Sequence, residues 1–513
     1  MVSNKNLGFI VVSVSVITLL GGVEGWKMFH RGRGLGGMLG SPKAVPNITV
    51  PPAEWFVQQL DHFNPTIPRT WEQRYFTNPS FFVPGGPVFL MIGGEGTADP
   101  TWMVTGQWIE YAKRYNALCF MLEHRYYGAS HPTRDLSARN LIYLSSEQAL
   151  ADLAYFIEAM TVKYEIPDGT KWIAFGGSYS GALAAWLRAK YPHLIHGAVS
   201  ASAPLLAKAD FREYYRVVED DLAISNGSCV SAIRDATQEL NMLLKDPLGH
   251  KTVNELFKLC DSIDVLEKND VSNLYESLAG NIAGVAQYNG DNRQFEGGTF
   301  NLTLNTVCDI MVNESLGTPV KRYSLVNEKI LEAYNKKCLD YKYDKLITDL
   351  GQVDWHCEAA ENGGRQWVYQ TCMEFGFYQT SSLTAEVFGD QFPLVFFIQQ
   401  CSDIFGPRYN AKQVMRGVKR TNTIYGGLQL QAARVVYVHG SVDPWHALGI
   451  TRTIRLDSPA IYIRGTAHCA DMYASSPSDP PQLVAARRKI SDLIGQWLDE
   501  DSEHNMTDTM ETL

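Results

Sequence analysis

The chain has 513 residues, of which 45% are hydrophobic and 19% are charged, and its formal net charge is -10. This balance predicts a globular protein with a large core and more than one domain or subdomain, and it excludes a largely disordered chain. A nucleic-acid surface needs clustered Lys and Arg to neutralise phosphates, so the acidic balance argues against nucleic acid as a partner.

The N-terminus has the pattern of a secretory signal. Lys5 precedes an apolar run from Leu7 to Leu20, which has the length of a signal-peptide core and is short for a membrane span. We expect a signal peptide over residues 1–25 and no membrane segment after its removal. An uncleaved signal anchor is the alternative.

Residues 26–50 contain the stretch "GRGLGG", which formally matches G-x-G-x-x-G. No strand pattern precedes it and no helical pattern follows, so a dinucleotide site is not indicated. We expect a flexible linker or a pro-segment here.

The cysteines and glycosylation sequons are consistent with secretion. Nine cysteines in a secreted chain predict disulfides with at least one thiol left over, and Cys119, inside an apolar run, is expected to be a buried free thiol. No paired C-x-x-C spacing is present, so we expect no metal and no cofactor. Candidate N-glycosylation sites are Asn47, Asn226, Asn301, Asn313 and Asn505.

The first half of the chain alternates strand and helix patterns. "GPVFLMIGGEG" and "NALCFMLEHRYYG" are apolar runs bounded by glycine, which is typical of strands buried on both faces of a parallel sheet. "SSEQALADLAYFIEAMTVKY" then has a helical apolar stripe behind a serine cap, and "KWIAFGG" is a further strand followed by a helix. This order predicts a doubly wound α/β sheet.

The stretch "GGSYSG" lies between that strand and the next helix. A nucleophile elbow lifts a serine oxygen above the sheet edge and needs very small residues on either side. Gly176 precedes Ser178 by two positions, as G-x-S-x-G requires, but Ser180 stands where the second glycine belongs and glycine follows at Gly181. The motif predicts Ser178 as a nucleophile. The alternative is a glycine-rich turn kept for packing.

A nucleophilic serine needs a general base and an acid that orients the base, and in this fold they follow in the order Ser, Asp, His. "ARVVYVHGSVDPWHALG" is a strand with Asp443 in the following loop, and "SPAIYIRGTAHCADM" is a strand followed by His468. We expect Asp443 as the orienting acid and His468 as the base, although an Asp before Pro can also cap a turn. The competing histidines, none of which combines a post-strand position with the correct order, are His196, His439 and His446.

An oxyanion hole needs backbone N–H groups aimed at the developing charge. The first is expected from Tyr179, directly after the nucleophile. The second is expected from Gly94 or Glu95 in the glycine loop that follows an early strand.

More than two hundred residues separate the first group of strands from the strand near residue 433, too many for a loop. They hold seven of the nine cysteines and helical patterns such as "SAIRDATQELNMLLKD", which predicts an inserted helical domain. It either caps the site and restricts entry or serves packing alone. We expect core segments over 51–205 and 425–500, the insertion over 206–424, and a disordered acidic tail over 501–513.

These motifs resemble the family of serine peptidases that includes lysosomal Pro-X carboxypeptidase, dipeptidyl peptidase II and thymus-specific serine protease, and are most similar to the last branch. The resemblance runs from about Trp55 to Trp497 and is carried by "QQLDHFNP", "WEQRYF", "FLMIGGEG", "LEHRYYGASHP", "FGGSYSGALAAWLRAKYPH", "GAVSASAPL", "WVYQTC", "GSVDPWHALG" and "GTAHCADM". It implies an α/β-hydrolase core with an inserted helical, disulfide-bonded cap, and the same three catalytic residues. The family's elbow is G-G-S-Y-x-G, with its glycine at Gly181.

The resemblance also implies three disulfides and leaves Cys357 and Cys469 either paired with each other or free. The implied pairs are Cys229 with Cys308, Cys260 with Cys338, and Cys372 with Cys401. Some members form dimers or two-chain assemblies, so a homodimer is one expectation.

The resemblance implies a secreted or lysosomal exopeptidase that cleaves peptides after proline near a chain end, through an acyl-enzyme on Ser178. Trp445 matches a family aromatic that lines the proline pocket, where a flat apolar wall can stack on a pyrrolidine ring. It could instead be a core aromatic. Side chains considered for holding a charged peptide terminus are Asp354, Glu361, Arg365 and Glu374. The alternative functions are a non-catalytic binding protein of this fold and an esterase.

Overall fold

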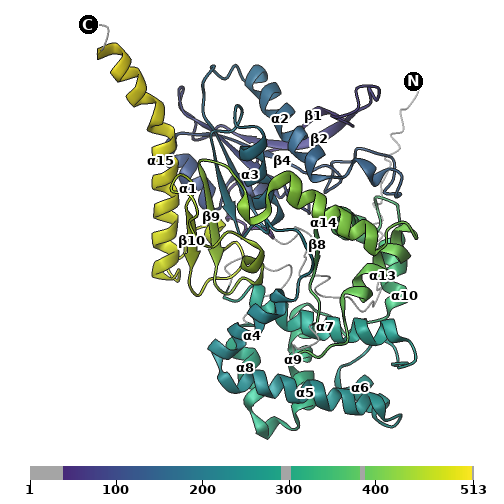
Figure 1. Cartoon of the computed structure of the whole chain (residues 1–513). Coiled ribbons are helices and arrows are strands. Elements are labelled where there is room, and N and C mark those ends of the chain that lie inside the picture. The colour runs from purple at the N-terminus through teal and green to yellow at the C-terminus, as the bar shows by residue number, and fades with distance from the viewer. Residues whose placement is uncertain (1–38, 291–301, 382–386, 511–513) are drawn as a thin grey trace, which may run out of the picture.

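The computed structural model describes residues 39–290, 302–381 and 387–510, with side chains described as far as residue 500. The predicted signal peptide, the "GRGLGG" stretch and Asn301 lie outside the described residues. Figure 1 shows two parts, an α/β part that contains a large sheet and a lobe made of helices below it.

The large sheet has eight strands in the order β1-β2-β4-β3-β5-β6-β9-β10. The pairs β1–β2 and β2–β4 are antiparallel, and the other neighbours are parallel. The strands are β1 (Glu54–Gln59), β2 (Thr70–Asn78), β3 (Val88–Ile92), β4 (Leu118–Leu122), β5 (Trp172–Gly177), β6 (Gly197–Ala201), β9 (Val435–Gly440) and β10 (Ala460–Ile463).

The central strands are apolar at every position because both faces of the sheet are covered. Every residue of β3, β4 and β5 is buried. Along β3, Leu90 belongs to the core on one face and Phe89 to the core on the other, as the two-residue repeat of a strand requires. The continuous apolar pattern seen in the sequence therefore corresponds to a doubly covered parallel sheet.

Helices cover the two faces of the sheet in separate groups. α2 (Ser146–Lys163), α3 (Tyr179–Lys190) and α14 (Ala411–Tyr425) contribute to the core on one face. α1 (Gln107–Tyr115) and α15 (Pro481–Met510) contribute to the core on the other. α2 begins as predicted, with the Ser145 side chain accepting a hydrogen bond from the Gln148 N–H.

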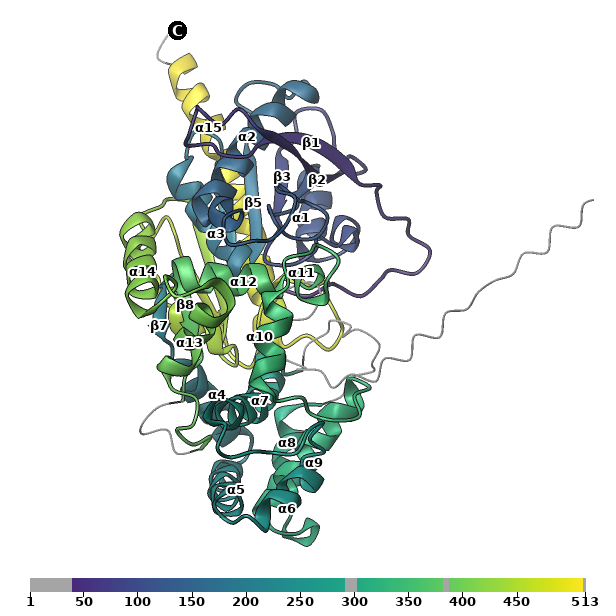
Figure 2. The ribbon, with the colours of Figure 1, turned by 90° about the vertical axis from the view of Figure 1, so that its right-hand side faces the viewer.

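The helical lobe lies between β6 and β9 in the chain, as Figures 1 and 2 show. Besides α14, the helices between β6 and β9, of which α11 and α12 lie beside the α/β part in Figure 2, are α4 (Glu213–Ser225), α5 (Gly227–Lys245), α6 (Gly249–Leu256), α7 (Lys268–Gln287), α8 (Leu304–Val312), α9 (Pro319–Ala333), α10 (Tyr343–Gly351), α11 (Glu358–Glu361), α12 (Gly364–Gln370) and α13 (Leu394–Phe405). A short parallel pair of strands, β7 (Lys208–Asp210) and β8 (Gly376–Tyr378), lies in the same part of the chain.

Three disulfides fasten these helices, and they are the pairs that the resemblance implies. Their sulfurs join Cys229 to Cys308, Cys260 to Cys338, and Cys372 to Cys401. Cys119, Cys357 and Cys469 are free thiols, so the last two do not pair with each other.

The acidic tail differs from the sequence-based expectation. Helix α15 continues to Met510, well into the segment 501–513 that was expected to be disordered. After Gly495 the sequence contains no glycine or proline that would end a helix, which accounts for the extension.

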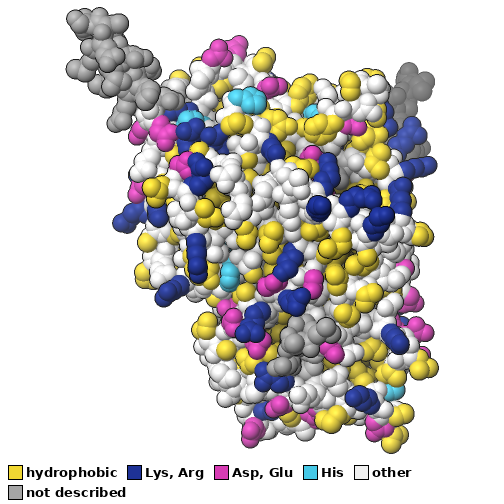
Figure 3. All heavy atoms as spheres, in the orientation of Figure 1, with side chains coloured by type: hydrophobic (Ala, Val, Ile, Leu, Met, Phe, Trp, Pro, Cys, Tyr) yellow, Lys and Arg dark blue, Asp and Glu magenta, His cyan; other side chains and the backbone are white. Residues whose placement is uncertain are grey.

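The surface carries both signs of charge. Over the face shown in Figure 3, Lys and Arg side chains are interspersed with Asp and Glu. No helix among the described residues is long and apolar enough to cross a bilayer.

Candidate active site

Ser178 stands in a strained turn between β5 and α3. Its backbone has φ 60° and ψ -129°, a region that side-chain-bearing residues rarely adopt and that costs about 1–3 kcal/mol. Gly176 and Gly181 have no room for a side chain, since a Cβ at Gly176 would lie 2.1 Å from the Ser180 carbonyl oxygen and one at Gly181 2.6 Å from that of Ala201. The turn has the geometry of a nucleophile elbow.

The departure at Ser180 has a structural explanation. The Ser180 hydroxyl donates to the Gly177 carbonyl oxygen at 2.8 Å and accepts from the Gly177 N–H at 3.1 Å. Gly181, in the next position, is the residue that faces β6. The serine therefore closes the turn, and Gly181 is the residue that lies against the neighbouring strand, β6.

Asp443 and His468 lie in the loops after β9 and β10, and their side chains meet. The Nδ1 of His468 lies 2.9 Å from the Oδ1 of Asp443, and both side chains are fully buried. The same Oδ1 accepts from the Trp445 N–H at 3.0 Å, so Asp443 both caps the short helix η6 (Pro444–Leu448) and holds His468. Asp443 can therefore cap this turn and orient His468 at the same time.

Burial and charge act on this pair in opposite directions. Burial disfavours both charged forms, but the mutual attraction of the two groups outweighs it. The pKa of Asp443 is therefore lowered, and the pKa of His468 is raised above its ordinary value. The carboxylate thus stabilises an imidazolium at His468, which a proton-accepting base in acyl transfer requires.

Backbone contacts bring Ser178 to the same edge of the sheet as His468. The Ser178 N–H donates to Ala201 at the end of β6, and the next residue, Ser202, accepts from the Cys469 N–H at 2.9 Å through its hydroxyl. A Cβ at Gly177 would lie 3.0 Å from the Cys469 sulfur. The neighbours of Ser178 and of His468 are therefore packed together.

Sequence reasoning missed Ser202 and Cys469 as supports of the site. Both have positive φ, 48° and 56°; Ser202 lies directly after β6 and Cys469 lies directly after His468. A small residue directly after an apolar strand could have pointed to Ser202, and the position next to His468 could have pointed to Cys469.

The predicted oxyanion residues lie around the elbow. Tyr179 is the first residue of α3, where the helix dipole favours negative charge. Gly94 follows β3, and a Cβ there would lie 3.6 Å from the side chain of Ser180. Glu95 is buried beside it. Which amides bind an oxyanion stays a prediction.

The competing histidines occupy other positions. His196 bonds the Trp497 carbonyl oxygen at 2.8 Å, on the side of α15. His439 is buried inside β9, and burial lowers its pKa to about 4. The His446 ring lies against that of Tyr462, with centroids 5.4 Å apart.

Part of the predicted linker also reaches the elbow. A Cβ at Gly177 would lie 2.8 Å from the Leu39 side chain, and Tyr473 donates to the Gly40 carbonyl oxygen at 3.4 Å. Leu39 packs with the core on that face of the sheet. Residues 39 and 40, the described end of the segment predicted as a linker, are therefore in contact with the core near Ser178.

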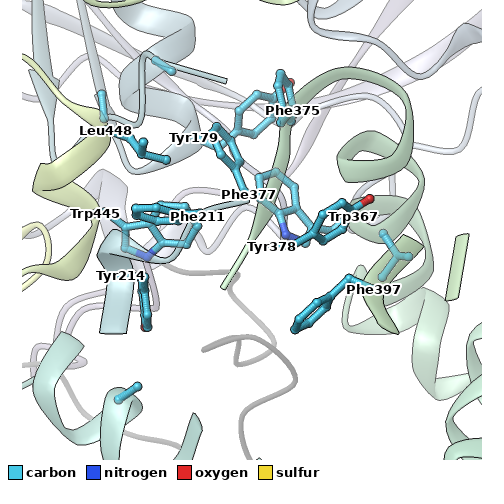
Figure 4. Packing of buried hydrophobic residues seen from close by; sticks show 14 of the residues in the cluster. Tyr179, Phe211, Tyr214, Trp367, Phe375, Phe377, Tyr378, Phe397, Trp445 and Leu448 are labelled. Carbon is cyan, nitrogen blue, oxygen red and sulfur yellow. The ribbon is translucent and has the colours of Figure 1, made fainter. Parts of the chain in front are cut away.

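Aromatic side chains surround Trp445 next to the site. Its ring centroid lies 5.5 Å from that of Phe211, 5.7 Å from that of Tyr214 and 5.5 Å from that of Phe377. Figure 4 shows these rings, which come from the core loop and from the inserted part of the chain. Trp445 is 1% exposed, and its indole N–H donates to the Gln287 side chain at 3.0 Å.

Two of the candidates for binding a peptide terminus are engaged in structural contacts. Glu374 accepts from the Ser146 N–H and hydroxyl at the start of α2. Arg365 donates to the carbonyl oxygens of Leu136 and Leu350. Asp354 and Glu361 are exposed. Among the described residues no cluster of His, Cys, Asp and Glu could hold a metal ion.

Residues 58–490 match the model of the family described as serine carboxypeptidase S28. The chain belongs to the serine carboxypeptidase S28 family. It is 36% identical to the mouse thymus-specific serine protease over 91% of this chain and 90% of that protein. It is 29% identical to bovine lysosomal Pro-X carboxypeptidase over 89% and 90% of the two chains.

Among solved structures, proline iminopeptidase from Mycobacterium smegmatis aligns with a TM-score of 0.36 and 12% identity, over 87% of this chain and 98% of that chain. The S28 member described here is a serine-type peptidase with an α/β-hydrolase core and a disulfide-bonded helical insertion. The resemblance drawn from the sequence motifs is confirmed.

Proposed function

We propose that this protein is an exopeptidase of the secretory pathway, extracellular or lysosomal, that cleaves peptides after proline near a chain end. The observation that carries the proposal is the buried His468–Asp443 pair at the sheet edge where the strained Ser178 stands. A strained serine, an oriented imidazole and a carboxylate in this chain order are the parts of an acyl-transfer site.

In the proposed reaction the Ser178 hydroxyl attacks the scissile carbonyl carbon and His468 takes its proton. The amides around the elbow receive the charge on the carbonyl oxygen. His468 then gives the proton to the leaving amine, and water attacks the acyl-enzyme with His468 again as base. Asp443 holds the imidazole through Nδ1 at 2.9 Å and stabilises its charged form.

Two features support the preference for proline at a chain end. Trp445 lies within a group of aromatic rings, and in this proposal it supplies the flat apolar wall that suits a pyrrolidine ring. The Pro-X carboxypeptidase among its relatives is named for a proline substrate. The helical insertion, part of which packs against the turn that carries Asp443, would restrict entry to chain ends.

Secretion would expose several sequons to glycosylation. Asn47 and Asn313 are exposed, and Asn226 is half-buried with its side-chain oxygen accepting from the Ser228 N–H. That bond uses the amide oxygen and leaves the nitrogen for a sugar. We propose Asn47, Asn226 and Asn313 as carriers of glycans, and a homodimer as the assembly to test.

The decisive experiment measures fluorophore release by the secreted protein and its Ser178→Ala variant. Three substrates are compared. The first is a dipeptide that ends in Pro and has a free amine, and the second is the same dipeptide with its amine blocked. The third has a blocked amine and carries, after Pro, a residue with a free carboxylate. Cleavage of the first alone indicates dipeptidyl peptidase activity, and cleavage of the third alone indicates carboxypeptidase activity. Either must vanish in Ser178→Ala. Absence of all three activities contradicts the proposal.

A further inference from the structure

Helix α7 of the insertion ends at the catalytic base. Its last residue, Gln287, is fully buried, and its carbonyl oxygen accepts from the His468 N–H at 2.9 Å. The next residue, Tyr288, places its ring edge-on to the His468 ring, with centroids 6.3 Å apart. The inserted part of the chain therefore has a direct backbone hydrogen bond to the residue that carries the imidazole.

The Gln287 side chain reaches the other half of the site. Its Oε1 accepts from the Trp445 indole N–H at 3.0 Å and from the Tyr214 hydroxyl at 2.7 Å. Its Nε2 donates to the Tyr288 hydroxyl at 2.7 Å. Because an indole nitrogen can only donate, the amide must turn its oxygen toward Trp445, and the bond to Tyr288 fixes the same orientation.

The Trp445 end of this network is continuous with the orienting acid. The backbone N–H of Trp445 donates to the Oδ1 of Asp443, which is also the atom that lies against the Nδ1 of His468. Gln287 thus contacts the backbone of His468 through its carbonyl group, and through its carboxamide it contacts Trp445 in the turn that carries Asp443. Both contacts are buried, where a lost hydrogen bond is costly.

We propose that Gln287 is a positioning residue for the peptidase reaction. It sets the plane of the Trp445 ring and the place of the His468 loop from the inserted domain. This inference rests on the proposed function, since Trp445 is taken there as the wall of the proline pocket. It assigns the insertion a part in catalysis in addition to any control of entry.

The test compares Gln287→Leu with a matched variant on the same helix. Asn281 is also buried in α7, and its side chain donates to Asn327 at 3.0 Å, away from the catalytic residues. Asn281→Leu therefore removes a buried hydrogen bond from α7 without touching Trp445 or His468. Both variants are compared for thermal midpoint, for kcat and KM on the proline substrate, and for the rate at which a fluorophosphonate probe labels Ser178.

The loss of a buried hydrogen bond costs about 1–3 kcal/mol. Where this cost falls on the transition state, Gln287→Leu lowers kcat/KM by roughly 5- to 150-fold. Asn281→Leu is expected to lower the thermal midpoint about as much as Gln287→Leu does, because each variant loses a buried hydrogen bond. It should leave kcat/KM within about threefold of the wild type. In Gln287→Glu burial favours the neutral carboxyl, which keeps an accepting oxygen for Trp445 and Tyr214 and an O–H that can donate to Tyr288, so it should recover most of the activity that Leu loses.

Equal losses of activity in the two Leu variants, or full activity in Gln287→Leu, would overturn the proposal. Labelling by the fluorophosphonate needs the serine and its base but no proline pocket, so it separates this inference from the proposed function. A wild-type protein that labels but cleaves no proline peptide contradicts the function, while slower labelling of Gln287→Leu alone still supports the positioning role. A wild-type protein that neither labels nor cleaves overturns both.

Discussion

The Nδ1 of His468 lies 2.9 Å from the Oδ1 of Asp443, and neither side chain is reached by solvent. In this geometry the carboxylate decides which imidazole nitrogen carries the proton, and it leaves Nε2 as the atom that acts as the base in the proposed reaction. The two residues lie in the loops that follow two adjacent parallel strands, so the sheet brings the starts of both loops together.

Replacing the carboxylate tests this relationship directly. Asp443→Asn keeps the size of the side chain but removes the negative charge, so the imidazole loses its preferred tautomer and its charge partner. We expect kcat to fall by about 10⁴-fold, with a thermal midpoint close to that of the wild type. Steady-state kinetics on the best peptide substrate would measure the first and a thermal scan the second. Retention of a tenth or more of the wild-type kcat would contradict the assigned role.

The close approach of Gly181 to β6 gives a second prediction. A Cβ at Gly181 would stand 2.6 Å from the Ala201 carbonyl oxygen, so Gly181→Ala must displace the elbow or the strand. Gly280 in α7 is a matched control, since a Cβ there would meet no atom within 4 Å and the residue is helical. We expect Gly181→Ala to lose most of its activity and to unfold at lower temperature.

By contrast, Gly280→Ala should be stabilising by about 0.4–1 kcal/mol, because alanine reduces the freedom of the unfolded chain. Thermal scans and peptidase assays of the two variants, made side by side, give both comparisons. An active, stable Gly181→Ala protein would show that the elbow does not need glycine at this position.

The sequence predicted the positions of Ser178, Asp443 and His468 because each follows an apolar strand, and the carboxyl ends of parallel strands meet at one edge. It could not predict Gln287, since nothing in a helical pattern shows which core loop its last residue will touch. The link through Ser202 was equally hidden, because a positive φ at a serine has no sequence signature. Local pattern determined the strand ends, whereas long-range packing determined what supports them.

Thiol reactivity gives a third prediction. Of the three free cysteines, Cys119 and Cys469 are buried and Cys357 is half-buried. Burial raises the pKa of both buried thiols, so neither forms a thiolate readily at neutral pH. We expect one thiol to react with a chromogenic disulfide reagent in the folded protein and three after denaturation without reductant. A Cys357→Ser variant should lose the fast reaction, and a fast reaction that persists would contradict the burial of the other two.

The fourth prediction concerns the pH dependence of stability. Burial raises the pKa of Glu374 to about 7 and that of Asp221 to about 8, against ordinary values of 4.5 and 3.8. Between the ordinary and the raised value, the folded protein holds a proton that the unfolded chain has released. Stability from these groups is therefore complete at low pH and falls as the pH rises from about 4 to about 8. The thermal midpoint should be higher at pH 5 than at pH 8, which would suit an acidic compartment.

Asp221→Asn isolates one of these groups, because an amide cannot ionise. The variant should raise the thermal midpoint at pH 8 by roughly 1–4 °C and change it little at pH 5, so that its midpoint depends less on pH than that of the wild type. Asp220, the adjacent residue, has a side chain that is 66% exposed, and its charge adds to the rise in the pKa of Asp221. Asp220→Asn should therefore relieve part of this effect and raise the midpoint at pH 8 by less than Asp221→Asn does. A wild-type midpoint that rises steadily from pH 5 to pH 8 would show that the buried carboxyls are ionised in the folded protein.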